Sequence, residues 1–258
     1  ILRHVQDHAQ ADGSLTVDFK FGKGATFGRV FSGGVGYQSC TRDTKLFCSA
    51  RFYVEDDIAN AFPTIMSQIF KLAGLFCPYY VARREVLSQE LCTPSRNMAQ
   101  LKQLFLRSLH GGFSRHKYDG FLPFLDLFER ELKSCTEKLL EGSKYRHIRT
   151  LLEEREVEKK DPQKKEKKSK LGRAIALICQ GVESRIMRAK TLFTERNKRA
   201  VATDLFDAHL REIGYLDLDS CSRFVEAETG MKVRFVSKPG SDVWPSSSHG
   251  SLPLSVLV

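Results

Sequence analysis

Strand-like runs stand near both ends of this chain, and a long stretch with helical periodicity separates them. Residues 13–55 contain short runs rich in Val, Phe and Thr, which are typical of strands. A strand–turn–strand unit fits residues 199–216, and a further strand fits 231–237. Strands so far apart in sequence can share one sheet only if the intervening segment is an insertion. The order therefore predicts an α+β fold in which a helical insertion interrupts a sheet.

The helical part consists of segments whose apolar residues recur every three or four positions. Pro63 falls in the first turn of the first segment, where proline is tolerated. This periodicity predicts helices over residues 58–76, 95–109, 121–153, 172–195 and 218–229.

The net charge of +10 favours a polyanionic partner. Residues 154–170 (EREVEKKDPQKKEKKSK) are rich in lysine but mixed in sign, and they contribute only +3. We interpret them as a solvated insertion. The remaining +7 is spread over the rest of the chain, which is compatible with a cationic groove.

The seven cysteines include no C-x-x-C pair, so we expect reduced thiols in an intracellular protein. No stretch approaches the roughly 20 apolar residues that span a bilayer, and we expect no membrane partner. The chain starts at Ile1 without a methionine, and we expect it to be part of a longer protein.

Two aspartates stand where predicted strands end. Asp57 lies in RFYVEDDIANAFPTIM, and Asp207 lies in RAVATDLFDAHLRE at the centre of the predicted hairpin. Two-metal phosphoryl transfer needs carboxylates that hold divalent ions a few ångström apart. Taken singly, each residue also fits a helix N-cap or a turn. The neighbouring Asp56 and Asp204 are the acids most easily mistaken for this pair.

Five segments, in order along the chain, resemble the family A DNA polymerases. Residues 28–42 (GRVFSGGVGYQSCTR) are similar to the segment that runs from a Gly-Arg pair to a Gln in that family. The D-x-x-N-x-F-P run from Asp57 looks like polymerase motif A, with a wording closer to family B. Lys102, followed by His110-Gly111, is similar to the K-x7-Y-G of the family A fingers helix.

The other two segments lie in the last third of the chain. Residues 178–193 (ICQGVESRIMRAKTLF) resemble the Q-G-x-A-A-D helix of the family, and Asp207 follows in the place of motif C. Residues 224–244 resemble the closing helix and strand.

The resemblance implies a right-hand polymerase core, in which a palm made of an antiparallel sheet with helices carries inserted helical fingers. Residues 1–75 and 172–245 would form the palm, 76–171 the fingers with the charged insertion at 154–170, and 246–258 a loose tail. A thumb and an exonuclease domain would be absent from this chain.

The resemblance also implies an activity: addition of dNTPs to the 3′-hydroxyl of a DNA primer-template. Asp57 and Asp207 would be the catalytic metal ligands for two Mg²⁺ ions, with Mn²⁺ able to substitute. Phe62 stands where family B enzymes place an aromatic ring that excludes the ribose 2′-hydroxyl. The other residues expected to bind the nucleotide are Lys102, His110 and Arg96. The residues expected to contact nucleic acid are Arg29, Gln38, Arg42, Gln180 and Gly181.

Departures from the family pattern keep alternatives open. Motif C reads His-Asp-Glu in family A, but here Phe206 precedes the acid and Ala208 follows it. Met98 stands where the fingers helix of the family has an arginine. The alternatives are a single-subunit RNA polymerase, a reverse-transcriptase-like enzyme, and a catalytically degenerate remnant that binds nucleic acid.

Overall fold

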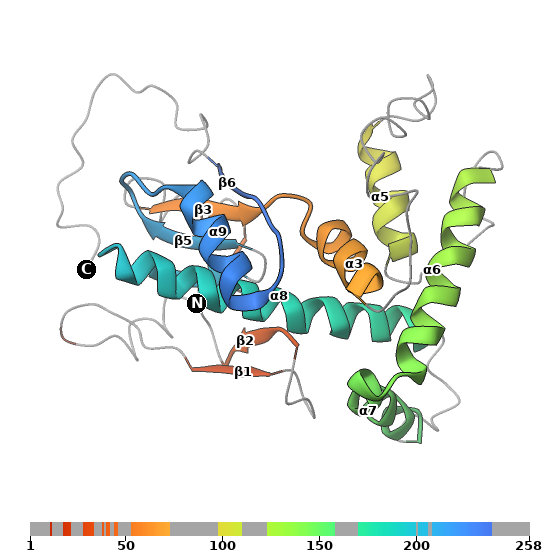
Figure 1. Cartoon of the computed structure of the whole chain (residues 1–258). Coiled ribbons are helices and arrows are strands. Elements are labelled where there is room, and N and C mark those ends of the chain that lie inside the picture. The colour runs from red at the N-terminus through yellow and green to blue at the C-terminus, as the bar shows by residue number, and fades with distance from the viewer. Residues whose placement is uncertain are drawn as a thin grey trace. The chain divides into compact units, whose positions relative to one another are not determined.

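The computed structural model describes residues 11, 18–21, 28–33, 38, 40–41, 44–45, 53–72, 98–109, 123–157, 170–199, 201–205 and 208–238. Strands and helices follow one another in the predicted order (Figure 1). The strands are β1 (Phe19–Phe21), β2 (Val30–Ser32), β3 (Tyr53–Ile58), β4 (Val201–Leu205), β5 (Ala208–Glu212) and β6 (Phe235–Lys238). The helices are α3 (Ala61–Leu72), α5 (Met98–Leu109), α6 (Pro123–Glu141), α7 (Arg146–Val157), α8 (Lys170–Arg196) and α9 (Leu218–Thr229), with a 3₁₀ turn at Ser143–Tyr145.

Four strands form an antiparallel sheet in the order β4-β5-β3-β6. β3 lies between two strands that come after the helical segments of the chain: Asp57 pairs with Ala208 of β5 on one side and with Val236 of β6 on the other. β1 and β2 form a separate antiparallel ribbon. The α+β fold with an interrupted antiparallel sheet is therefore confirmed.

The chain divides into two compact units. One contains residues 1–59 and 184–258, and within its described part it holds the sheet and α9. The other contains residues 60–183 and is helical in its described part. The helical unit thus enters the sequence between β3 and β4. Residues 246–258, the predicted tail, lie outside the described residues.

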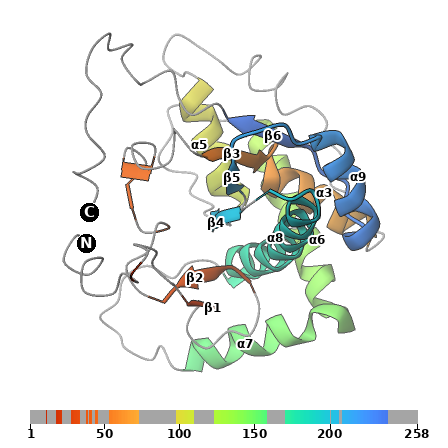
Figure 2. The ribbon, with the colours of Figure 1, turned by 90° about the vertical axis from the view of Figure 1, so that its left-hand side faces the viewer.

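The start and the end of α9 are each set by a capping residue. The Asp217 side chain accepts hydrogen bonds from the backbone N–H groups of Asp219 and Ser220 at 3.0 Å, which satisfies donors that a helix start leaves without partners. Gly230 ends the helix in the left-handed region at φ 71°. Within the same unit, α9 lies beside β6, one of the two edge strands of the sheet (Figure 2).

The helix predicted over 121–153 is two helices instead. Gly142 adopts an extended conformation (φ −66°, ψ 148°) between α6 and α7, so the α-helical hydrogen-bond pattern stops there. Glycine has the weakest helix preference after proline, and a short 3₁₀ turn then redirects the chain into α7.

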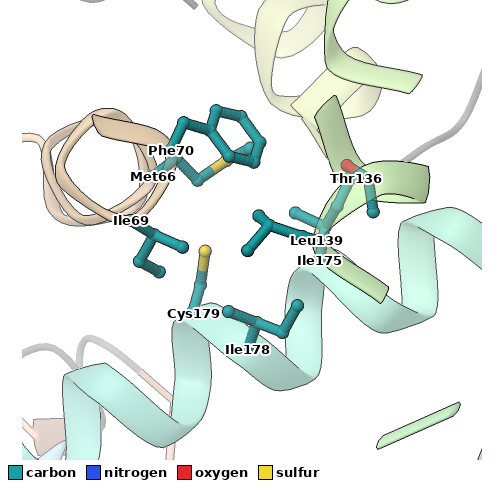
Figure 3. Close-up of a pocket in the computed structure, with 8 residues that line it drawn as sticks. All are labelled: Met66, Ile69, Phe70, Thr136, Leu139, Ile175, Ile178 and Cys179. Atoms are coloured by element: carbon teal, nitrogen blue, oxygen red, sulfur yellow. The ribbon is translucent and has the colours of Figure 1, made fainter. Parts of the chain in front are cut away.

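The core of the helical unit is formed by α3, α6 and α8. A cavity of about 10 Å³ lies between these helices, and Figure 3 shows the side chains that line it. Thr136 contributes the one hydroxyl in its lining, and that hydroxyl donates to the Leu132 carbonyl at 2.7 Å. A cavity this small with so few polar groups is typical of a dry packing defect. Its lining consists of Met66, Ile69, Phe70, Thr136, Leu139, Ile175, Ile178 and Cys179.

Candidate active site

β3 carries different chemistry on its two faces. Successive side chains of a strand point to opposite sides of a sheet. Asp56 is fully buried, whereas the side chain of Asp57 keeps 18% of its surface exposed. Ala208, the cross-strand partner of Asp57, is the residue that follows Asp207 in the sequence. Asp207 itself lies outside the described residues.

Asp56 is the centre of a buried ionic network. Arg211 of β5 donates from Nε to Asp56 Oδ2 at 2.6 Å, and Ser237 of β6 donates to Oδ1 at 2.5 Å. Lys190 of α8 donates to Oδ2 at 3.2 Å. Lys190 and His209 are also fully buried and form a short hydrogen bond between Nζ and Nε2. The carboxylate therefore links three strands and a helix of one unit.

The pKa shifts agree with this network. Burial alone would raise the pKa of Asp56, but the charge of Lys190 and the hydrogen bonds from Ser237 and Arg211 lower it. Burial lowers the pKa of Lys190 to about 8 in spite of the attraction of Asp56. Burial and the charge of Lys190 lower the pKa of His209 to about 3. His209 is therefore neutral at pH 7, and its Nε2 accepts the hydrogen bond, because an ammonium can only donate.

The face of Asp57 carries a second, more exposed cluster. Lys238 of β6 contacts Asp57 Oδ2 at 2.5 Å and Glu55 Oε1 at 2.9 Å. Burial would lower the pKa of Lys238, but hydrogen bonds to Asp57 and Glu55 raise it. The Lys238 side chain is 49% exposed. Asp57 thus holds a cation in a setting that water can reach.

A segment predicted to contact nucleic acid is hydrogen-bonded to α8 through Ser184. Ser184 of α8 donates to the Gly28 carbonyl at 2.8 Å, which fixes the residue before Arg29. Gly181 is one turn earlier on α8, and a side chain added there would meet nothing within 4 Å in the described part of the protein. Gln38 accepts a hydrogen bond from the Ser32 backbone N–H through Oε1 at 3.1 Å, so it supports the β2 end of the ribbon.

For the other predicted residues that the structure describes, it gives the position in the fold. Gln180 is half-buried in α8, and Lys102 lies within α5. Phe62 is buried in the first turn of α3, with 8% of its surface exposed. His110, Arg96 and Arg42 lie outside the described residues.

Sequence reasoning missed the partners of Asp56 and Asp57. One available signal was Lys190, a charge on the apolar stripe of α8 four residues after Ile186, because a cation in an apolar stripe needs a buried partner. Another was the alternation of β3, which puts Asp56 and Asp57 on opposite faces. Lys238 and Glu55 became recognisable only once the register of β3 and β6 was known.

Within the described ranges, no group of three or more His, Cys, Asp and Glu side chains is arranged to hold a metal ion. The oxygen donors of Asp57 suit a hard cation such as Mg²⁺ or Mn²⁺, and Oδ2 contacts the Lys238 ammonium at 2.5 Å. In the part of the chain that the structure describes, no helix has the length and apolar character needed to cross a bilayer.

No protein-family model matches the chain. The chain is 26% identical over 231 residues to a protein of Sputnik virophage named "Putative helicase V13". The match covers 82% of this chain but 28% of that protein. Among solved structures, the chain is similar to the POL domain of Pol1 from M. smegmatis in complex with DNA primer-template and dNTP, with a TM-score of 0.49 and 13% identity. That similarity covers 92% of this chain and 50% of the other.

Proposed function

We propose that this chain is the polymerising part of a longer protein and that it adds dNTPs to the 3′-hydroxyl of a DNA primer on a template. The observation that carries the proposal is the pairing of Asp57 with Ala208, because it joins motif A to the residue after the motif C aspartate. The five polymerase-like segments, in their order along the sequence, supply the second support.

In this proposal Asp57 and Asp207 hold two Mg²⁺ ions, which supply charge neutralisation for the triphosphate and the attacking oxygen. The buried network around Asp56 fixes β3 between β5 and β6, and so fixes the backbone that carries Asp57. Lys102 binds the triphosphate from α5 as a point charge.

One further function is favoured by a specific observation. Ala208 lies opposite Asp57, where the family A pattern has a glutamate, so the site has one acid fewer than the family. A remnant that binds primer-template without extending it would fit that loss. The name of the virophage relative describes a protein of which the match covers 28%, and the ATP-binding sequence G-x-x-x-x-G-K-[ST] does not occur in this chain.

Primer extension tests the proposal. The assay is run at low salt, because contacts between protein and phosphate weaken steeply as the salt concentration rises. The assay uses DNA and RNA templates with dNTPs and rNTPs. We expect dNTP addition on DNA, and its loss in both Asp57→Asn and Asp207→Asn, because an amide cannot neutralise a divalent cation. Asp219→Asn is the matched control, since Asp219 is an exposed aspartate on α9. Near-normal extension by Asp57→Asn would refute its metal role, and duplex binding without extension by the wild type would favour the remnant.

A further inference from the structure

Lys238 lies between two carboxylates on the Asp57 face of the sheet. It is the direct cross-strand partner of Glu55, and its side chain reaches diagonally to Asp57, two residues further along β3. The ammonium is 2.9 Å from Glu55 Oε1 and 2.5 Å from Asp57 Oδ2. A single positive charge thus offsets two negative charges that would otherwise repel each other across one face.

This contact differs in kind from the ion pair on the other face. Lys190 is fully buried, and its position is also fixed by His209. The Lys238 side chain is 49% exposed, and those of Glu55 and Asp57 are 33% and 18% exposed, so water reaches all three. Half-exposed ion pairs contribute little to stability, and the lysine stem has four rotatable carbons. Lys238 can therefore leave Asp57 at small cost.

A carboxylate oxygen 2.5 Å from an ammonium is poorly placed to bind a second cation at the same time. A Mg²⁺ ion binds oxygen at about 2.0–2.1 Å, so a metal at Asp57 Oδ2 and the present ammonium would be only a few ångström apart. Like charges at that separation repel strongly near a protein surface. The ammonium and a metal ion thus compete for Asp57 Oδ2.

We propose that Lys238 is an internal competitor of the metal ion at Asp57. Without metal it holds the Asp57 carboxylate in place and offsets the repulsion between Asp57 and Glu55; when metal binds, it turns to solvent. Lys238 therefore sets the metal concentration at which the site fills. This inference rests on the proposed metal role of Asp57.

The test measures Mn²⁺ binding to the metal-free protein by calorimetry and electron paramagnetic resonance, without nucleic acid or nucleotide. The variants are Lys238→Met, which removes the charge, Lys238→Arg, which keeps it, and Lys232→Met, which removes an exposed lysine six residues earlier. Each is measured with Asp57 intact and with Asp57→Asn, so that binding elsewhere on the protein is subtracted.

We expect Lys238→Met to bind Mn²⁺ about five-fold more tightly than the wild type. This factor corresponds to the largest free energy that an exposed ion pair usually contributes. Lys238→Arg and Lys232→Met should stay within about two-fold of the wild type, since each leaves a cation beside Asp57. We also expect Mn²⁺ to raise the melting temperature more in Lys238→Met, because that variant starts with two unscreened carboxylates. A purely structural lysine would lower the melting temperature without changing Mn²⁺ affinity.

Two outcomes would overturn the inference, and they are distinguishable. If Asp57→Asn abolishes a Mn²⁺ site while Lys238→Met leaves its affinity unchanged or weaker, the competition is refuted and the metal role of Asp57 survives. If Asp57→Asn leaves Mn²⁺ binding unchanged, no metal binds at Asp57, and both the inference and the metal role in the proposed function are refuted.

Discussion

Asp56 and Asp57 are consecutive residues of β3 whose carboxylates bind cations on opposite faces of the same sheet. Asp56 Oδ2 is 2.6 Å from Arg211 Nε in the buried interior, and Asp57 Oδ2 is 2.5 Å from the half-exposed ammonium of Lys238. Asp56 thus stabilises the buried side of the sheet, whereas Asp57 takes no part in that buried network.

The same substitution at these two positions should have unequal effects on stability. Asp56→Asn leaves the Arg211 and Lys190 side chains buried without their counter-charge, which we expect to lower the free energy of unfolding by about 3–5 kcal/mol. Asp57→Asn loses a half-exposed pair and should lower it by less than about 1 kcal/mol. Urea unfolding of the two variants checks this. Equal losses would mean that the network around Asp56 does not hold the sheet.

Lys190 predicts a pH dependence of stability above neutrality. Its pKa is about 8 in the folded protein against 10.5 for an ordinary lysine, with Asp56, Arg211, His209 and Cys221 around it. Between these values the unfolded chain carries a proton that the folded protein has lost, so stability from this group rises with pH. Below about pH 8 both states are protonated, and the contribution is constant.

We therefore expect Lys190→Met to remove a rise in unfolding free energy that the wild type shows between pH 8 and 10.5. Urea unfolding at three pH values in this window measures the slope. The exposed Lys232→Met variant should keep the wild-type slope. A Lys190→Met protein with an unchanged slope would mean that Lys190 stays protonated in the fold.

The order of elements could be predicted from sequence because the patterns that encode it are local. The β4–β5 hairpin and α9 were predicted close to their observed bounds. The partners of Asp56 could not be predicted, because Lys190 is 134 residues away and Ser237 is 181 residues away. Contacts between residues so far apart in the sequence do not appear in the local pattern of apolar and polar residues. The roles of Asp57 and Asp207 stay predictions, since the described residues include the first and not the second.

Gly181 offers a test that separates helix stability from nucleic-acid contact. A methyl group there would meet nothing within 4 Å among the described residues, so packing does not require glycine. We expect Gly181→Ala to stabilise the protein by up to about 1 kcal/mol through helix propensity. If a DNA strand approaches α8 at this point, the same change weakens primer-template binding. If the variant is more stable but its DNA affinity, measured by fluorescence anisotropy, is unchanged, then Gly181 does not contact DNA.

Phe62 tests the sugar preference of the proposed enzyme. An aromatic ring beside the sugar leaves a ribose 2′-hydroxyl without a hydrogen-bond partner, which costs about 1–3 kcal/mol. We expect Phe62→Val to lower the ratio of dNTP to rNTP incorporation. Phe70→Val is the matched control, because Phe70 is a buried phenylalanine of the same helix that lines the small cavity. Phe62 is itself 8% exposed, and both changes should lower stability. If the ratio of dNTP to rNTP incorporation is the same in both variants, Phe62 acts in the core and not in sugar selection.

The placement of β3 ahead of the helical unit has a consequence for synthesis. Asp56 leaves the ribosome 155 residues before Arg211, which at about 5–20 residues per second is a delay of about 8–30 seconds. Helices form from local contacts during that interval, whereas the sheet has to wait for its distant strands. A carboxylate that will be fully buried thus stays without its strand partners while the intervening helices are made. A nascent chain stopped before Phe235 would lack both β6 and Lys238, and its finished helices would accompany an open sheet.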